Sequence, residues 1–204
     1  MRTITCLCER SFEADLPDLI DLDREPGTLE AIIRGDFLTV TCPHCERILK
    51  PEPRVRLSSR ERGLDVLAVP ETDRLAFYGG ALEIPGGCEL LLGYPELHER
   101  ALVLKAGLDA RAVEVLKYHL LAKALETPES EEEILVAYVG RIEDGKLRFS
   151  ITGLRPGELA LLDLPFDRYE RAVKDLGKTL KTEPFSRIFE GPYRSVRILE
   201  TLEG

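Results

Sequence analysis

The 204-residue sequence contains no tryptophan, and its one methionine is Met1. Without these side chains we expect neither an aromatic platform that stacks bases nor a soft, Met-rich groove that accepts many partners. No apolar run approaches the about 20 residues that a membrane-spanning helix needs. The segment Met1–Thr5 does not resemble a signal peptide, so the sequence predicts a cytoplasmic protein with reduced cysteines and no membrane association.

Familiar catalytic motifs are also absent. The sequence contains no G-x-S-x-G, no H-E-x-x-H and no phosphate-binding glycine-rich loop. Of its three histidines, His44 lies between two cysteines, while His98 and His119 fall on predicted helices without a partner three or four residues away. Cys88 stands alone at the start of an apolar strand, where a cysteine is usually a small buried hydrophobe. The sequence favours a role other than catalysis and leaves open an enzyme with an unfamiliar site.

The formal net charge is −9 at pH 7, so most of the surface should repel nucleic-acid phosphates. A basic segment directly after Cys45 is the local exception. Its charged side chains are Arg47, Lys50, Arg54, Arg56, Arg60 and Arg62, against Glu52 and Glu61. One interpretation is a nucleic-acid contact. The favoured one is a solvated edge strand in which Val55 and Leu57 face inward and the neighbouring arginines face outward.

The sequence does contain four cysteines in two tight pairs. They are Cys6 and Cys8 in C-L-C, and Cys42 and Cys45 in C-P-H-C. Zn²⁺ prefers four ligands in a tetrahedron and binds thiolates well, so two short turns with two sulfurs each predict a structural zinc site. The proline of the second turn fixes φ at its first corner, which should aim backbone N–H groups at the sulfurs. Four unrelated free cysteines are the alternative, and His44 and Cys88 are predicted to take no part.

The 33 residues between the two pairs are more than a minimal zinc ribbon needs, so they should contain structure of their own. The pattern predicts a strand at Ser11–Asp15 and a strand at Asp36–Thr41 that runs into the second pair. Between them, apolar residues at helical spacing predict a helix with Thr28 as its N-cap and Gly35 as its C-terminal stop.

Together these motifs resemble the CpXC domain family of bacterial and archaeal proteins. The resemblance rests on C-x-C near the N-terminus, E-P-G-T-L-E-A-I-I-R-G at residues 25–35, and the strand that leads into C-P-x-C. It continues through L-D-V-L-A-V-P-E at residues 64–71 and a helical section at residues 97–100, 107–109 and 113–117, and so covers about residues 4–125. Membership would imply the fold and the zinc site. It would imply no reaction, because the family has no established activity.

Two positions depart from the family's usual pattern. Glycine usually follows the second cysteine of such a turn, where the chain has φ above zero, but here Glu9 and Glu46 occupy these positions. A non-glycine residue in that conformation costs about 1–2 kcal/mol. Both carboxylates would also add to the negative charge of a zinc tetrathiolate, with Arg10 and Arg47 as partial compensation. The sequence leaves open whether the two glutamates weaken metal binding.

The region after the basic segment predicts a β-rich body closed by helices. Short apolar runs separated by glycine and proline turns predict an antiparallel meander of strands at Leu64–Val69, Leu75–Tyr78, Ala81–Ile84 and Glu89–Leu92. A short helix is expected at Pro95–Arg100 and a longer one at Asp109–Leu125, with Asp109 as its N-cap.

The best candidate for an internal boundary is the turn and acidic run at Thr127–Glu133. The elements expected after it are a hairpin of Ile134–Ile142 and Lys146–Ile151 around Asp144-Gly145, an amphipathic helix after Pro165 and a final strand at Ser195–Thr201. The two-residue hairpin turn is expected to be type I′. A hairpin with one helix of its own is barely stable alone, so this second unit should pack on the first half of the chain. The apolar stripe of the Asp109–Leu125 helix and the alternating strand face of the hairpin are the surfaces expected to meet.

The sequence therefore predicts an α+β fold with an N-terminal zinc-ribbon-like module (about residues 1–54) on an antiparallel β-rich body. The first domain would span residues 1–126, and a small C-terminal α+β unit would span residues 131–204. Four thiolates leave no open position for water on zinc, which favours a structural metal and an interaction or adaptor role with a protein partner. The alternatives are an enzyme with its site in a cleft between the two halves and, less favoured, nucleic-acid binding through the basic segment.

Overall fold

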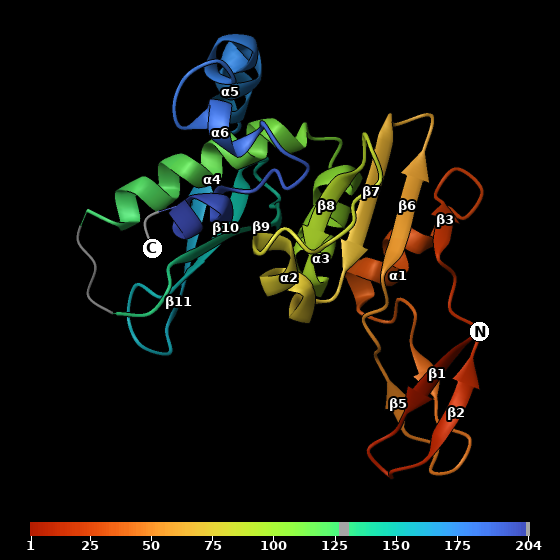
Figure 1. Ribbon diagram of the computed structural model, residues 1–204. Coiled ribbons are helices and arrows are strands. Elements are labelled where there is room, and N and C mark those ends of the chain that lie inside the picture. The colour runs from red at the N-terminus through yellow and green to blue at the C-terminus, as the bar shows by residue number, and fades with distance from the viewer. Residues whose placement is uncertain (127–130, 203–204) are drawn as a thin grey trace. The chain divides into compact units, whose positions relative to one another are not determined.

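The computed structural model describes residues 1–126 and 131–202 (Figure 1). Helices and mostly antiparallel sheets give the α+β class that the sequence predicts. The chain divides into two compact units, Met1–Ala101 and Leu102–Gly204, which we call the N-terminal unit and the C-terminal unit. The division falls within helix α3 (Gly93–Lys105). None of the helices in the described ranges is long and apolar enough to span a bilayer.

Two short antiparallel hairpins belong to the N-terminal unit, and we call them the cysteine lobe (lower right in Figure 1). They pair β1 (Arg2–Thr5) with β2 (Ser11–Ala14), and β4 (Val40–Thr41) with β5 (Ile48–Leu49). β2 confirms the first predicted strand. The strand predicted at residues 36–41 is wrong except for its last two residues. Asp36 begins a turn instead, since its carbonyl accepts the backbone N–H of Thr39 at 3.3 Å.

The second sheet of the N-terminal unit has the strand order β3-β6-β7-β8. Its strands are β3 (Leu19–Asp21), β6 (Val55–Ser59), β7 (Leu64–Val69) and β8 (Glu89–Leu92). β6 and β7 are antiparallel, but β3 is parallel to β6 and β8 is parallel to β7. The predicted antiparallel meander is therefore wrong.

The meander fails because two of its expected strands do not form. The apolar run Leu75–Tyr78 belongs to helix α2 (Arg74–Tyr78), which follows the 3-10 turn η1 (Glu71–Asp73), and Ala81–Ile84 is irregular. These segments form the crossover that brings β8 alongside β7 in the parallel sense. A four-residue apolar run fits a strand or one helical turn equally well, so its periodicity could not separate the two.

The basic segment supplies β6, which lies between β3 and β7 and is not an edge strand. The predicted edge location is thus wrong, while the predicted alternation is confirmed, since Val55 and Leu57 are both buried. They join a core formed by the sheet with α1 (Gly27–Arg34) and α3, whose buried members are Ile20, Leu22, Ile32, Phe37, Val55, Leu57, Val66, Ala68, Leu91, Leu97 and Ala101. Gly35 ends α1 with φ of 81°, as predicted. The N-cap of α1 is Pro26, so the predicted N-cap Thr28 is wrong. Thr28 is buried in the first turn of the helix.

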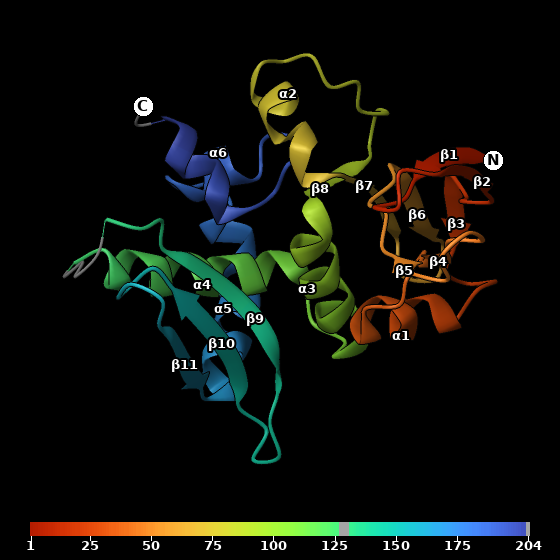
Figure 2. The same ribbon diagram turned by 90° about the horizontal axis from the view of Figure 1, so that it is seen from below.

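The C-terminal unit has a three-stranded antiparallel sheet with the order β11-β10-β9. The elements are α4 (Ala110–Ala124), β9 (Leu135–Arg141), β10 (Leu147–Thr152), β11 (Leu159–Leu164), α5 (Phe166–Thr179), α6 (Phe185–Ile188) and η2 (Val196–Leu202). Figure 2 shows α4 against one face of this sheet. The side chain of Asp109 accepts a hydrogen bond from the backbone of Arg111 at 2.9 Å and caps α4 as predicted. The helix predicted after Pro165 is α5.

A single apolar cluster fills the C-terminal unit. It contains Val113 and Leu121 of α4 together with Tyr138 of β9 and Phe149 of β10. The predicted packing of the long helix on the hairpin is therefore confirmed. The final strand predicted at Ser195–Thr201 is wrong, because this segment is the 3-10 helix η2.

The hairpin between β9 and β10 has a different turn from the one predicted. The backbone of Ile142 donates to the carbonyl of Lys146 at 3.0 Å, and that of Gly145 donates to the carbonyl of Ile142 at 2.9 Å. Gly145 alone among the loop residues has a positive φ, 81°. These contacts define a three-residue loop with glycine in the left-handed position, not a two-residue type I′ turn.

The predicted boundary at Thr127–Glu133 lies partly outside the described residues. Compactness divides the chain at a different place, between Ala101 and Leu102, and α4 shares its core with strands from after that boundary. The proposed domain limits of 1–126 and 131–204 stay a prediction, which the folding of separate fragments would check.

Candidate metal centre

Each hairpin of the cysteine lobe ends in a turn that begins with a cysteine. Cys6 follows β1 and Cys42 follows β4, and the backbone N–H of each donates across the hairpin, to Arg10 and Arg47 respectively, at 2.9 Å. The two turns therefore share one backbone pattern although the cysteine spacing differs between them. The local sequence thus presents two sulfurs from each turn on one side of its hairpin.

The four sulfur atoms meet in space. The Sγ atoms of Cys6 and Cys45 are 3.6 Å apart and those of Cys8 and Cys42 are 3.9 Å apart, and all four lie within 4.8 Å of one another. All are free thiols. Both short contacts join one turn to the other, so the sulfurs link the two hairpins. Four such thiols could bind a metal ion. Within the described residues, no other group of three or more histidine, cysteine, aspartate or glutamate side chains lies close enough to do so.

Burial differs between the two members of each pair. Cys6 and Cys42 are 3% and 0% exposed, whereas Cys8 is half-buried and Cys45 is exposed. The inner sulfurs lie at the base of each turn and the outer ones nearer to solvent. A metal ion held here would therefore sit close to the surface of the lobe.

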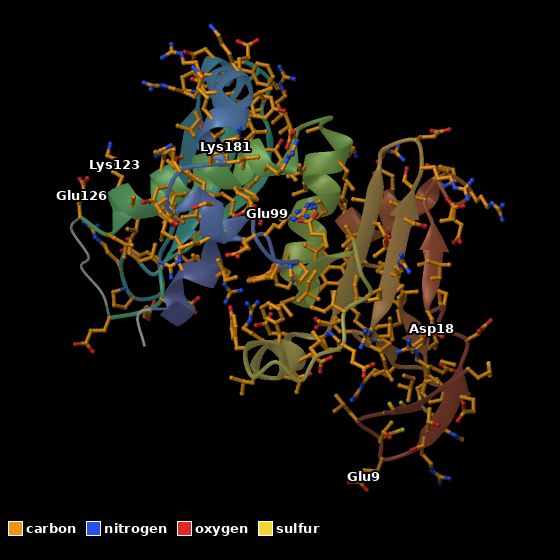
Figure 3. All side chains as sticks on the ribbon, turned by 45° about the horizontal axis from the view of Figure 1, so that its top comes forward. Glu9, Asp18, Glu99, Lys123, Glu126 and Lys181 are labelled. Carbon is orange, nitrogen blue, oxygen red and sulfur yellow. The ribbon has the colours of Figure 1, made fainter. Side chains whose placement is uncertain are left out.

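Glu9 and Glu46 have the backbone conformation that the sequence suggested. Their φ angles are 64° and 59°, and the backbone N–H of each donates to the carbonyl of the first cysteine of its turn at 2.9 Å. Both side chains are exposed, and Figure 3 shows Glu9 at the tip of its hairpin, pointing away from the lobe. This conformation costs about 1–2 kcal/mol for a residue other than glycine.

Backbone dipoles and mutual repulsion set the protonation of the thiols. Desolvation opposes ionisation of Cys42, but backbone N–H groups of His44 and Cys45 donate to its sulfur and lower its pKa to about 7. The backbone N–H of Arg47 favours the Cys45 thiolate, yet the neighbouring sulfurs, led by Cys6, raise its pKa to about 11. The two thiols of the second turn therefore differ in acidity, with Cys42 the more readily ionised. The predicted aiming of N–H groups at the second pair is confirmed.

The remaining candidate residues lie elsewhere. His44 is exposed beside the cluster, and His98 contacts the carbonyl of Ile33 through Nε2 at 3.2 Å. Cys88 is buried, with its sulfur 3.4 Å from a carboxylate oxygen of Asp65. Burial and that carboxylate raise the pKa of Cys88 to about 11, which makes it a poor nucleophile.

Several arginines of the basic segment are already paired. Arg56 makes two hydrogen bonds to the carboxylate of Asp65, at 2.6 and 2.5 Å, and Arg62 lies 3.9 Å from Asp23. Arg54 donates to the backbone carbonyl of Glu83. The sequence did not reveal these pairs because both carboxylates lie outside the segment, Asp65 on β7 and Asp23 in the turn after β3.

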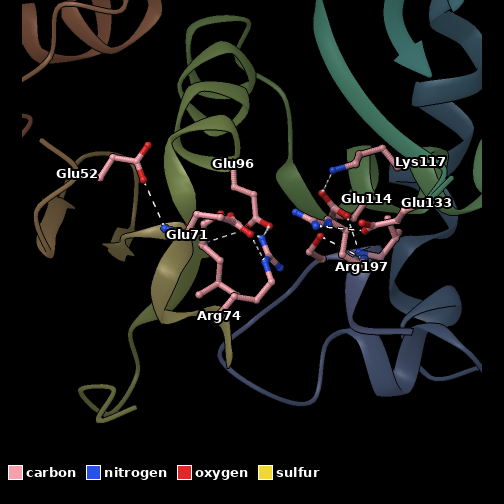
Figure 4. Close-up of polar contacts among 11 residues, drawn as sticks. Glu52, Glu71, Arg74, Glu96, Glu114, Lys117, Glu133 and Arg197 are labelled. Carbon is pink, nitrogen blue, oxygen red and sulfur yellow. Dashed lines mark hydrogen bonds and ion pairs between the residues drawn. The ribbon is translucent and has the colours of Figure 1, made fainter. Parts of the chain in front are cut away.

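Two further polar clusters escaped the sequence reasoning (Figure 4). In the N-terminal unit, the guanidinium of Arg74 donates hydrogen bonds to the carboxylates of Glu71 and Glu96, at 3.0 Å to each. In the C-terminal unit, Lys117 donates to Glu114 at 2.8 Å within α4, and the second oxygen of Glu114 accepts the backbone N–H of Val196 at 2.9 Å. The only sequence signal for the second cluster was the spacing of three residues between Glu114 and Lys117 on a predicted helix. Both clusters pair opposite charges, which indicates a structural role.

Comparisons with known proteins agree with the cysteine pattern. No solved structure matches the chain. A relative from Treponema pallidum (strain Nichols), described as an uncharacterized protein, is 28% identical, and the match covers 97% of this chain and 97% of the relative. The family model described as CpXC protein matches residues 4–117, more than half of the chain, including all four clustered cysteines. The chain belongs to the CpXC family.

Proposed function

We propose that Cys6, Cys8, Cys42 and Cys45 hold one structural zinc ion. The observation that carries this proposal is the spacing of their sulfurs, 3.6 and 3.9 Å for the two closest contacts between the turns. A tetrahedron with zinc–sulfur bonds of about 2.3 Å has sulfur–sulfur edges of about 3.8 Å. The chemistry of the donors also fits, because four thiolates are a common structural zinc set.

Zinc in this site would supply folding energy and not catalysis. Four thiolates would fill its coordination sphere and leave no position for a reactive water. Binding a structural zinc contributes about 10–16 kcal/mol in small zinc modules. The ion would fix the two hairpins of the cysteine lobe against each other and neutralise the repulsion between their thiolates.

The organised lobe would then serve as a protein-interaction module. Two large apolar side chains lie exposed next to the metal centre, Leu7 at 79% within the first turn and Ile48 at 67% directly after the second. Apolar side chains that a metal site holds in fixed positions at the surface are suited to contact another protein. This surface supports the adaptor role that the sequence favoured.

Metal analysis of the purified protein tests the zinc site. We expect one zinc per chain in wild-type protein prepared without chelator, and no zinc in the Cys42→Ser variant. The matched control Cys88→Ser should be fully loaded, because Cys88 is hydrogen-bonded to Asp65 and is not part of the cluster. Wild-type protein that contains no zinc and takes none up would refute the site. Equal zinc in the Cys42→Ser variant would refute the assignment of its ligands.

Chemical crosslinking followed by mass spectrometry tests the interaction surface. We expect a protein partner crosslinked to the wild-type lobe to be lost in a Leu7→Ser/Ile48→Ser variant that keeps its zinc. Leu75→Ser is the control, since Leu75 is 83% exposed on α2 and not on the cysteine lobe. If the same partner survives the double change, this surface is not the one that binds it.

A further inference from the structure

The C-terminal unit contains an open crevice of about 740 Å³ between α4, α5 and the β10–β11 edge of the sheet. Its volume lies within the range of about 300–1,000 Å³ typical of small-molecule sites. The crevice is formed by residues of the C-terminal unit alone. None of the four clustered cysteines lines it, so the crevice is separate from the proposed zinc site.

The floor of the crevice is the part of the sheet that α4 does not cover. Phe149 of β10 and Leu162 of β11 are cross-strand neighbours, so their side chains lie on the same face of the sheet. Phe149 is fully buried, while Leu162 remains 37% exposed. α4 therefore covers the middle strand and leaves apolar surface of β11 open beside it.

The walls of the crevice are also apolar. Leu116 and Leu120 line it from α4, Ile151 and Leu164 from the sheet, and Ala172 from α5. An elongated apolar group would bury this surface without displacing any hydrogen bond of the sheet. The apolar lining favours an alkyl chain over a polar molecule.

Basic side chains gather at the rim. His119 and Lys123 come from α4, and Arg168 and Arg171 come from α5, against the carboxylate of Asp175. Arg171 is paired with Asp167 at 2.7 Å, but Lys123 and Arg168 form no ion pair within the described part of the chain. Figure 3 shows Lys123 on α4, pointing outward. A cationic rim stands out on a protein whose formal net charge is −9.

We propose that this crevice binds a single-chain amphiphile with an anionic head, of the class of long-chain carboxylates. The alkyl chain lies over Leu162 and Leu164 between the two helices. The carboxylate stays at the rim, where Lys123 and Arg168 supply charge-assisted hydrogen bonds. Charge complementarity distinguishes this occupant from a neutral or cationic amphiphile, which would find the same walls but no partner for its head.

Calorimetric titration of the full-length protein with dodecanoate below its micelle concentration tests the proposal. We expect saturable binding of dodecanoate, about tenfold weaker binding of dodecyltrimethylammonium, and no binding of acetate. The first comparison isolates the head group and the second isolates the alkyl chain. Amide chemical shifts should change around α4, α5 and β11 and not in the cysteine lobe.

Three variants locate the ligand. Ala172→Phe, which fills the crevice from a partly exposed position on α5, should abolish binding. Arg168→Gln should weaken dodecanoate binding about tenfold and should not weaken binding of dodecyltrimethylammonium. Lys174→Gln is the matched control, because Lys174 is exposed on the same helix but does not line the crevice.

No saturable binding of dodecanoate, equal affinity for the two head groups, or affinity unaffected by Ala172→Phe would each overturn the proposal. A thermal melt of each variant without ligand shows that its fold is intact. If instead the protein forms a dimer that Leu162→Asp disrupts, and dodecanoate does not bind, the crevice is an interface between copies and the proposal is wrong.

Discussion

The cysteine lobe has strands of two to four residues, whereas the C-terminal unit has strands of six or seven residues and a helix of 15. The contrast extends to the interior. Two of the buried apolar side chains in the lobe are the cysteines Cys6 and Cys42, while Tyr138, Leu147 and Phe149 are almost fully buried in the C-terminal unit. Hairpins this short are marginal in water without support from elsewhere.

The two regions therefore depend on different sources of stability. In the C-terminal unit, burial of apolar side chains opposes the loss of chain entropy in the ordinary way. In the cysteine lobe, two of the buried side chains, Cys6 and Cys42, belong to the set that would bind the metal, so we expect the interior to form fully only when a metal is bound. Changes made in each region separately should expose this difference, with the largest effect in the lobe.

Loss of one thiol should unfold the lobe and spare the C-terminal unit. We expect Cys42→Ser to abolish amide protection in β1, β2, β4 and β5, because the zinc contribution of about 10–16 kcal/mol is lost. Protection of β9 and β10 should be unchanged. Hydrogen exchange measured by mass spectrometry checks both regions in one experiment, and a lobe that stays protected in zinc-free protein would contradict the dependence on metal.

Two fragments test whether the C-terminal unit needs α4 in order to fold. A fragment of residues 102–204 should melt cooperatively in the presence of a chelator, since it contains α4 and the whole apolar cluster. A fragment of residues 131–204 should be poorly folded, because it lacks α4. Circular dichroism distinguishes them, and a cooperative melt of the shorter fragment would support the domain limits drawn from the sequence.

Breaking the buried ion pair of Glu114 and Lys117 should destabilise the protein less than loss of the metal. Glu114→Ala removes the carboxylate that pairs with the buried ammonium of Lys117, whose side chain is 4% exposed, and should cost about 3–5 kcal/mol of unfolding free energy. Replacing both residues by leucine should recover most of that loss. Urea denaturation measures both variants, with zinc content expected to stay at the wild-type level in each. An equal loss in the single and double variants would show that the pair itself stabilises the unit.

The smallest effect concerns the two strained glutamates. Glu9→Gly and Glu46→Gly relieve a positive φ that costs about 1–2 kcal/mol, less the entropy that glycine adds to the unfolded chain. Each variant should bind zinc slightly more tightly than wild type in a chelator competition. The same change at Glu13, an ordinary strand residue of β2, should weaken the lobe.

Local patterns in the sequence predicted the features that depend on a few consecutive residues. The cysteine turns, the positive φ at Glu9 and Glu46, the cap at Asp109 and the stop at Gly35 are of this kind. Each follows from the chemistry of one residue and its immediate neighbours.

Features set by distant partners were not predictable in the same way. β3 has three residues and is a strand because β6 lies beside it, and Leu75–Tyr78 forms a helix within the connection between β7 and β8. The crevice beside β11 depends on how far α4 reaches across the sheet, which no local pattern encodes. The pairing of Arg56 with Asp65 likewise depends on strand register.

β3 and β6 begin soon after the first and second cysteine turns, and they pair in parallel with Leu19 opposite Arg56. Cys8 and Cys42 are 34 positions apart in the chain, so a metal bound to both would close a large loop before these strands meet. Parallel pairing is slow because a long segment must be closed first, and each doubling of that segment costs about 0.6 kcal/mol. The metal would then set a rate as well as a stability: refolding of the β3–β6 pair should slow when a chelator is present, although neither strand supplies a ligand.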